Sequence, residues 1–79
     1  MKGKYIFKGD DISTDVLFKI EQVASILAEK EKIPFDNAYE KFLFSDTYSI
    51  LQKVNNLYWA ESAEFIYDEY LREKNRIPA

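Results

Sequence analysis

The segment from Phe42 to Trp59 constrains the fold most strongly, because it holds signals for both the start and the end of a short helix. Ser45 is a favourable N-cap, since its hydroxyl can accept a hydrogen bond from the backbone N–H of Thr47 or Tyr48. Asp46 follows in the first turn, where a carboxylate meets the positive end of the helix dipole. Asn55-Asn56 predicts the end of the helix, because Asn tolerates the left-handed conformation. A helix this short needs neighbours to hold it.

Apolar residues at helical spacing predict three further helices around this one. Val16, Ile20, Val23 and Leu27 form one stripe, with Ser13 or Thr14 as the expected N-cap. Pro34 or its neighbour should begin the next helix. We expect Phe35, Ala38 and Phe42 to form its inner face, which Tyr39 and Leu43 broaden. The predicted fold is all-α, a small four-helix domain in which two long helices clasp two short ones. The expected bounds are residues 13–31, 34–43, 46–55 and 60–74.

Large aromatic side chains should fill much of a core this small. We expect burial of the following residues: Ile20, Val23, Leu27, Phe42, Leu51, Trp59 and Ile66. Aromatic residues should also pack at the two ends of the central helix, namely Phe42, Phe44, Tyr58 and Trp59.

Residues 1–12 precede the predicted helical domain, which spans residues 13–79, and contain both glycines of the chain. Tyr5-Ile6-Phe7 has the character of a short extended segment, but the sequence shows no second strand to pair with it. The segment is then either a tail lying on the helices or a strand that pairs with another chain. Both readings stay open from the sequence.

Composition excludes several kinds of chemistry. The chain has no His and no Cys, so neither a Ser-His nor a Cys-His nucleophile pair can be assembled. We therefore expect no enzymatic activity and no cofactor. The sequence contains no apolar run long enough to span a membrane and no signal-peptide core, which favours a cytoplasmic location.

Two groups of residues are candidates for functional sites. Glu61, Glu64 and Asp68 could offer oxygen ligands to a hard cation, but a solvated helix face explains them better. Residues 34–53 could form a helix-turn-helix, yet the second helix would present a single cation. With 14 acidic and 11 basic residues and a net charge of −3, the chain lacks the basic surface that phosphate binding requires. Nucleic-acid binding is therefore the alternative function and not the leading one.

Three apolar residues do not fit the stripes that should bury their helices: Phe18, Ile26 and Phe65. Either Tyr5-Ile6-Phe7 folds back and covers them, or they form an exposed patch of the kind that marks an interface. The candidate interface thus comprises Phe18, Ile26 and Phe65 with Tyr5 and Phe7. We slightly favour a homodimer, because two glycines make the N-terminal segment costly to order.

The pattern Ala38-Tyr39, Phe42, Ser45-Asp46-Thr47-Tyr48, Leu51, Leu57-Tyr58-Trp59 and Phe65-Ile66-Tyr67 resembles a family of short bacterial proteins of unknown function, the DUF3791-like family. Some of these are encoded beside genes that resemble toxins. The resemblance covers residues 13 to 73 and transfers no catalytic residues. It implies a helical accessory protein that interacts with another protein, in the manner of an antitoxin. Residue chemistry and resemblance together predict a non-enzymatic protein-interaction module, whose protein partner the sequence does not identify.

Overall fold

The computed structural model describes residues 5–53 and 56–76. Four helices form the domain: α1 (Ser13–Glu31), α2 (Phe35–Leu43), α3 (Asp46–Gln52) and α4 (Ala63–Arg76). A 3-10 turn, η2 (Tyr58–Ala60), precedes α4. A hairpin of two short strands, β1 (Ile6–Phe7) and β2 (Asp10–Asp11), precedes α1. The predicted all-α four-helix fold is confirmed, with two long helices and two short ones.

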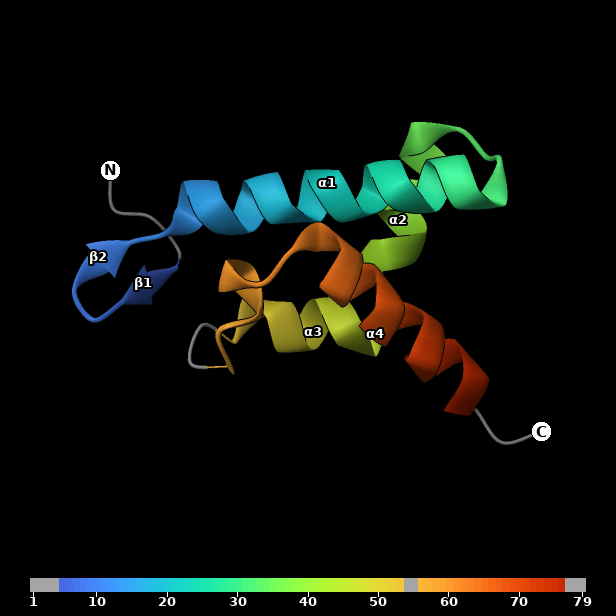
Figure 1. Ribbon diagram of the computed structural model, residues 1–79. Helices are drawn as coiled ribbons and strands as arrows, with labels where there is room; N and C mark the ends of the chain where they lie inside the picture. Colours follow the sequence, from blue (N-terminus) through green and yellow to red (C-terminus); the bar gives the residue numbers. More distant parts are fainter. Residues whose placement is uncertain (1–4, 54–55, 77–79) are drawn as a thin grey trace.

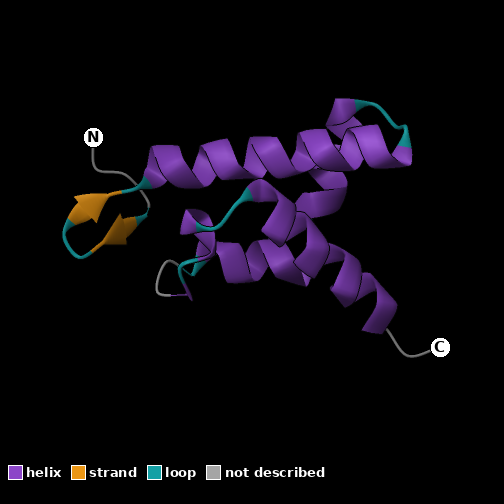
Figure 2. Cartoon of the chain, viewed as in Figure 1, coloured by secondary structure: helices purple, strands orange, loops and turns teal. Residues whose placement is uncertain are grey.

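The first helix organises the other elements. In Figure 1, α1 runs along the top of the molecule, and α3 and α4 lie beneath it. The second helix reverses the chain at the C-terminal end of α1, and the hairpin lies at the N-terminal end of α1 (Figure 2). One face of α1 supplies Val16, Ile20, Val23 and Leu27 to the core, and each is almost completely buried. The predicted stripe is therefore the face that packs against α2 and α4.

The cap of α3 is as predicted, but its end is not. The hydroxyl of Ser45 accepts a hydrogen bond from the backbone N–H of Tyr48 at 3.0 Å. Lys53 leaves the helical conformation, so the helix ends at Gln52. Asn55, one of the two residues expected to stop the helix, lies outside the described residues.

The N-cap of α1 differs from the expectation, although its bounds do not. Its N-cap is Ile12, which offers no side-chain acceptor. Ser13 is already helical, and its hydroxyl accepts a hydrogen bond from the backbone N–H of Tyr5 at 3.2 Å. The Asp11 carboxylate accepts from the Ser13 N–H at 2.9 Å instead. The sequence pattern assigns the Ser13 hydroxyl to the cap, but in the structure this hydroxyl makes a tertiary contact with Tyr5 instead.

The expectation that Tyr5-Ile6-Phe7 has no strand partner is wrong. Ile6 pairs with Asp11 and Phe7 with Asp10 in an antiparallel ladder. Lys8 and Gly9 form the two-residue turn, both with positive φ, which is typical of a tight hairpin. Such short strands leave no detectable periodicity, so the turn residues carry the only local signal.

Tyr5, the residue that precedes β1, anchors the hairpin to the helices. Tyr5 is buried in the core with 7% of its surface exposed. Its hydroxyl accepts a hydrogen bond from the side-chain amide of Gln52 at 2.9 Å. Burial, and then the proximity of the Tyr5 hydroxyl, raises the pKa of the neighbouring Tyr48 phenol. The N-terminal segment is therefore bound to the end of α3 within one chain.

Burial corrects three aromatic predictions. Trp59 is half-buried and not fully buried, because it lies on η2 at the edge of the core, where the Phe7 ring contacts it. Phe35 is 41% exposed and not part of the inner face, which consists of Ala38 and Phe42. Phe44 is 85% exposed and does not pack at the end of α3. It follows the buried Phe42 by two residues, which on a helix means a turn of about 200° to the opposite side.

Candidate functional site

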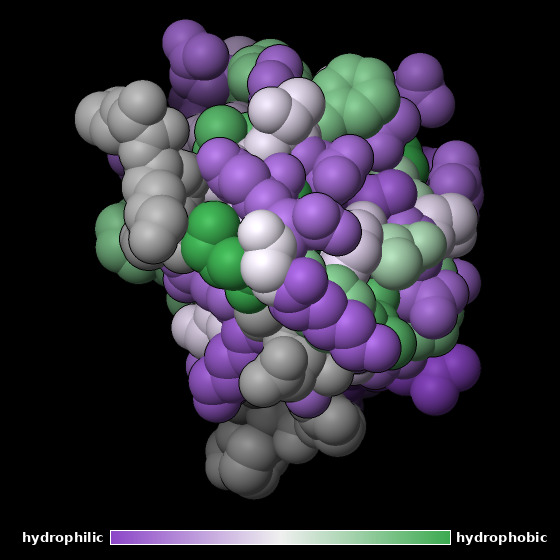
Figure 3. Space-filling model, turned by 90° about the vertical axis from the view of Figure 1, so that its left-hand side faces the viewer, coloured by the Kyte–Doolittle hydropathy of each residue, from purple (hydrophilic) through white to green (hydrophobic). Residues whose placement is uncertain are grey.

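The residues predicted to form an interface differ in their exposure. Phe18 is 61% exposed on α1, and Phe65 is 37% exposed on α4. Ile26 is half-buried and packs against the core. The Phe65 ring contacts the edge of the Tyr58 ring, with the centroids 5.6 Å apart. Hydrophobic side chains appear only as separate groups among polar ones on the end of the molecule shown in Figure 3.

Tyr5 and Phe7 are engaged in contacts within the chain. Tyr5 belongs to the core, and the Phe7 ring meets the Trp59 ring edge-on at a centroid distance of 5.4 Å. The hairpin thus covers η2, while Phe18 keeps most of its surface exposed. The structure leaves Phe18 and Phe65 as accessible members of the predicted set.

A more continuous apolar surface lies along the flank of α2. Phe35, Tyr39 and Leu43 follow one another at intervals of four residues, so their side chains form a row on the helix surface. The Phe35 and Tyr39 rings touch, with centroids 5.8 Å apart and planes inclined at 44°. Tyr39 and Leu43 are partly buried against the core, whereas Phe35 is exposed.

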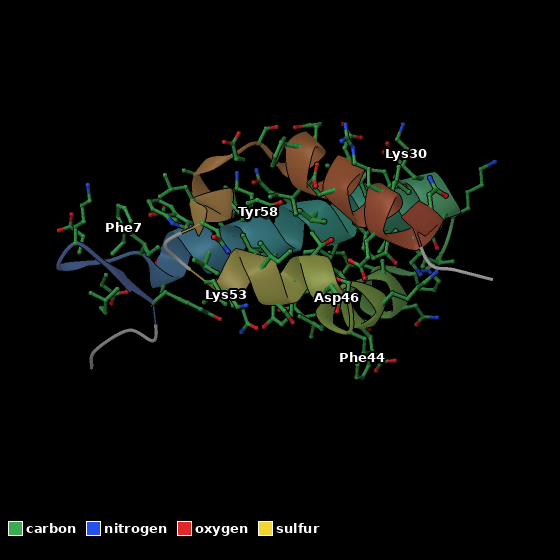
Figure 4. The ribbon with its side chains drawn as sticks, turned by 90° about the horizontal axis from the view of Figure 1, so that it is seen from below. Phe7, Lys30, Phe44, Asp46, Lys53 and Tyr58 are labelled. Atoms are coloured by element: carbon green, nitrogen blue, oxygen red, sulfur yellow. The ribbon has the colours of Figure 1, made fainter. Side chains whose placement is uncertain are left out.

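Two carboxylates border this row. A hollow with a volume of about 410 Å³ is lined by five residues of α2: Phe35, Asp36, Tyr39, Glu40 and Leu43. Phe44 comes directly after α2, at the outer edge of the molecule in the corner that leads to α3 (Figure 4). We call these six residues the α2 face.

The charge of the α2 face is uncompensated within the described part of the chain. Asp36 and Glu40 are exposed and take part in neither of the ion pairs found there. The nearby Lys41 points to another side of the helix, where its ammonium lies 2.6 Å from the Glu31 carboxylate. This hydrogen bond raises the pKa of Lys41, so the lysine stays charged and engaged with Glu31.

A second hollow, also of about 410 Å³, lies between α1 and the start of α4. Ile26 is its one large apolar side chain, and the rest of its lining is polar or small: Lys19, Gln22, Ser25, Ser62, Ala63 and Glu64. Ser62 caps α4, since its hydroxyl accepts a hydrogen bond from the Phe65 N–H at 3.1 Å. The lining of this hollow is therefore more polar than that of the hollow on α2.

The acidic trio does not form a metal site. Glu61, Glu64 and Asp68 are all exposed. Across residues 5–53 and 56–76, no group of three or more potential ligands lies close enough to hold a metal ion. Within the same residues, no helix has both the length and the apolar character needed to cross a membrane.

Comparisons with family models, with curated proteins and with solved structures found no match. The resemblance to the DUF3791-like family therefore stays a prediction.

The sequence contained a signal for the α2 face, which the prediction assigned wholly to the inner face of this helix. Phe35, Ala38, Tyr39, Phe42 and Leu43 together occupy an apolar arc of more than about 100° on a nine-residue helix. Of these, Ala38 and Phe42 are buried, whereas Tyr39 and Leu43 are only partly buried against the core. The remaining apolar residues are thus more than this fold can bury.

Proposed function

We propose that this chain is a non-enzymatic protein-interaction module that binds its partner through the α2 face. The observation that carries the proposal is the 85% exposure of Phe44, which directly follows Leu43, the last residue of the row formed by Phe35, Tyr39 and Leu43. Each large apolar side chain left in water forgoes roughly 1.5–3 kcal/mol that burial would recover. Contiguous apolar surface with a polar rim is characteristic of protein-binding sites. The antitoxin-like role implied by the family resemblance is one form of this function.

The competing function is nucleic-acid binding, and the α2 face does not favour it. Asp36 and Glu40 would repel phosphate. A gel-shift titration separates the two functions, because phosphate-dependent binding weakens steeply with salt. A shift at micromolar protein that disappears as salt rises would replace our proposal with the competing one.

Site-specific photocrosslinking in the source cell tests the proposal directly. Benzoylphenylalanine would replace Phe44 in one variant and Glu21, an exposed residue of α1, in the control. We expect a crosslinked protein species of defined mass from position 44 and none from position 21. Equal crosslinking at both positions, or none at position 44, would refute the assignment of this face.

A further inference from the structure

The hollow on the α2 face is lined by two aromatic rings and two carboxylates, which are groups that attract a cation. Phe35 is followed by Asp36, and Tyr39 by Glu40, so each ring has a carboxylate as its neighbour in the chain. All four residues line one hollow, and the two rings are in contact there. The face of an aromatic ring carries partial negative charge and attracts ammonium and guanidinium groups.

The chain supplies no cation of its own to this hollow among the described residues. Its lining contains no basic residue, and Lys41 is engaged with Glu31. An incoming Lys or Arg would meet two unpaired carboxylates and two rings at once. A neutral side chain would gain only the apolar contact, and an acidic one would be repelled.

We propose that the α2 hollow binds a Lys or Arg side chain on a basic, amphipathic segment of a partner protein. This inference rests on the proposed function and specifies the chemistry of the partner. Glu40 and Phe44 are four residues apart, so a cation bound beside Glu40 lies about one helical turn from an apolar anchor on Phe44. The partner segment therefore carries a large apolar residue next to its cation.

Nuclear magnetic resonance titration with three helical model peptides tests this inference. The peptides share one leucine face, and their polar face consists of arginine, glutamine or glutamate. We expect the arginine peptide to bind most tightly and to shift the amide signals of Phe35 to Phe44. Its affinity should fall as salt rises, because the charges lie near the surface.

Matched double variants identify the carboxylates responsible. The variant D36N/E40Q keeps the shape of the hollow and removes its two charges, while E21Q/E29Q makes the same change in net charge on exposed sites of α1. The first variant should weaken binding of the arginine peptide by about tenfold, the combined effect of two exposed charge contacts and the loss of orientation at the rings. The second variant should change it by less than about twofold.

Three outcomes would overturn the inference. If the glutamine peptide binds equally well and D36N/E40Q has no effect, the face is an apolar docking site, and only the cation specificity is wrong. If no peptide shifts the α2 signals, the hollow is not a peptide site, and the crosslinking experiment decides the proposed function separately. If the chain alone sediments as a dimer that F44S dissociates, a second copy occupies the face. The F44S variant should fold normally, because Phe44 makes little contact with the protein.

Discussion

Glu73 of α4 accepts two hydrogen bonds from Thr47 of α3 on a single carboxylate oxygen. The Thr47 backbone N–H lies 2.8 Å from this Oε1 atom and the Thr47 hydroxyl 2.7 Å. The second oxygen, Oε2, accepts from the backbone N–H of Asp46 at 2.9 Å. Glu73, which lies 26 positions after Thr47, thus supplies hydrogen-bond acceptors to the backbone N–H groups in the first turn of α3. Because the first N–H groups of a helix have no partner within it, this contact fixes α3 against α4.

Replacing Glu73 with Gln should lower the free energy of unfolding by about 1–2 kcal/mol. The amide keeps one acceptor oxygen but turns an NH2 donor toward N–H or O–H groups that donate themselves. Chemical denaturation measures the loss. Glu69→Gln serves as the control, since Glu69 forms a long ion pair of 3.7 Å with the exposed side chain of Arg72. Equal effects of the two substitutions would mean that the Glu73 contact contributes nothing specific.

Stability should also decline in acid through Glu73. Burial alone would raise the pKa of this carboxyl, but the hydrogen bonds from Thr47 and Asp46 outweigh burial and hold the pKa below its ordinary value of 4.5. A carboxyl with a lower pKa in the folded state stabilises the fold above its unfolded pKa. That contribution is lost as the pH falls below about 4.5 and through the folded pKa. Unfolding measured from pH 7 to pH 3 should show a shallower acid decline in Glu73→Gln than in the unsubstituted chain.

The Phe7 and Trp59 rings should be energetically coupled. Their edge-to-face contact joins the hairpin to η2, and such pairs contribute about 0.5–1.5 kcal/mol beyond the burial of their area. A double-mutant cycle with Phe7→Ala and Trp59→Ala measures the coupling. Additive effects within about 0.3 kcal/mol would show that this ring contact does not help to hold the hairpin. Phe18→Ala with Trp59→Ala is the uncoupled reference, since Phe18 is exposed on α1.

Tyr70→Phe should leave stability unchanged or raise it by up to about 1 kcal/mol. The Tyr70 hydroxyl is buried and has no hydrogen-bond partner among the residues that the structure describes. The ring itself is retained in the variant and keeps its edge contact with Phe42. Tyr5→Phe offers the opposite case, because its hydroxyl accepts from Gln52, and it should cost about 0.5–1.5 kcal/mol. Thermal unfolding compares the two; destabilisation by Tyr70→Phe would reveal a partner for that hydroxyl.

The sequence by itself determined the helical elements. Spacing of apolar residues placed α1 at its observed bounds, and the N-cap at Ser45 placed the start of α3, because both signals act within a few residues. The first turn of α4 starts later than expected, since residues 58–60 form a separate 3-10 turn. Spacing alone does not distinguish these two kinds of turn.

Only the tertiary structure decided which apolar residues are buried and which are presented to a partner. Phe35, Phe44 and Trp59 are large apolar side chains that the sequence pattern assigns to the interior, yet each is wholly or partly exposed. Burial depends on whether another element covers a given flank of a helix, and local spacing carries no information about that element. The same reason explains why the hairpin was not predicted. Its neighbour Tyr5 accepts a hydrogen bond from Gln52, which lies 47 residues further along the chain. The α2 face exists because α1 and α3 leave that flank of α2 uncovered.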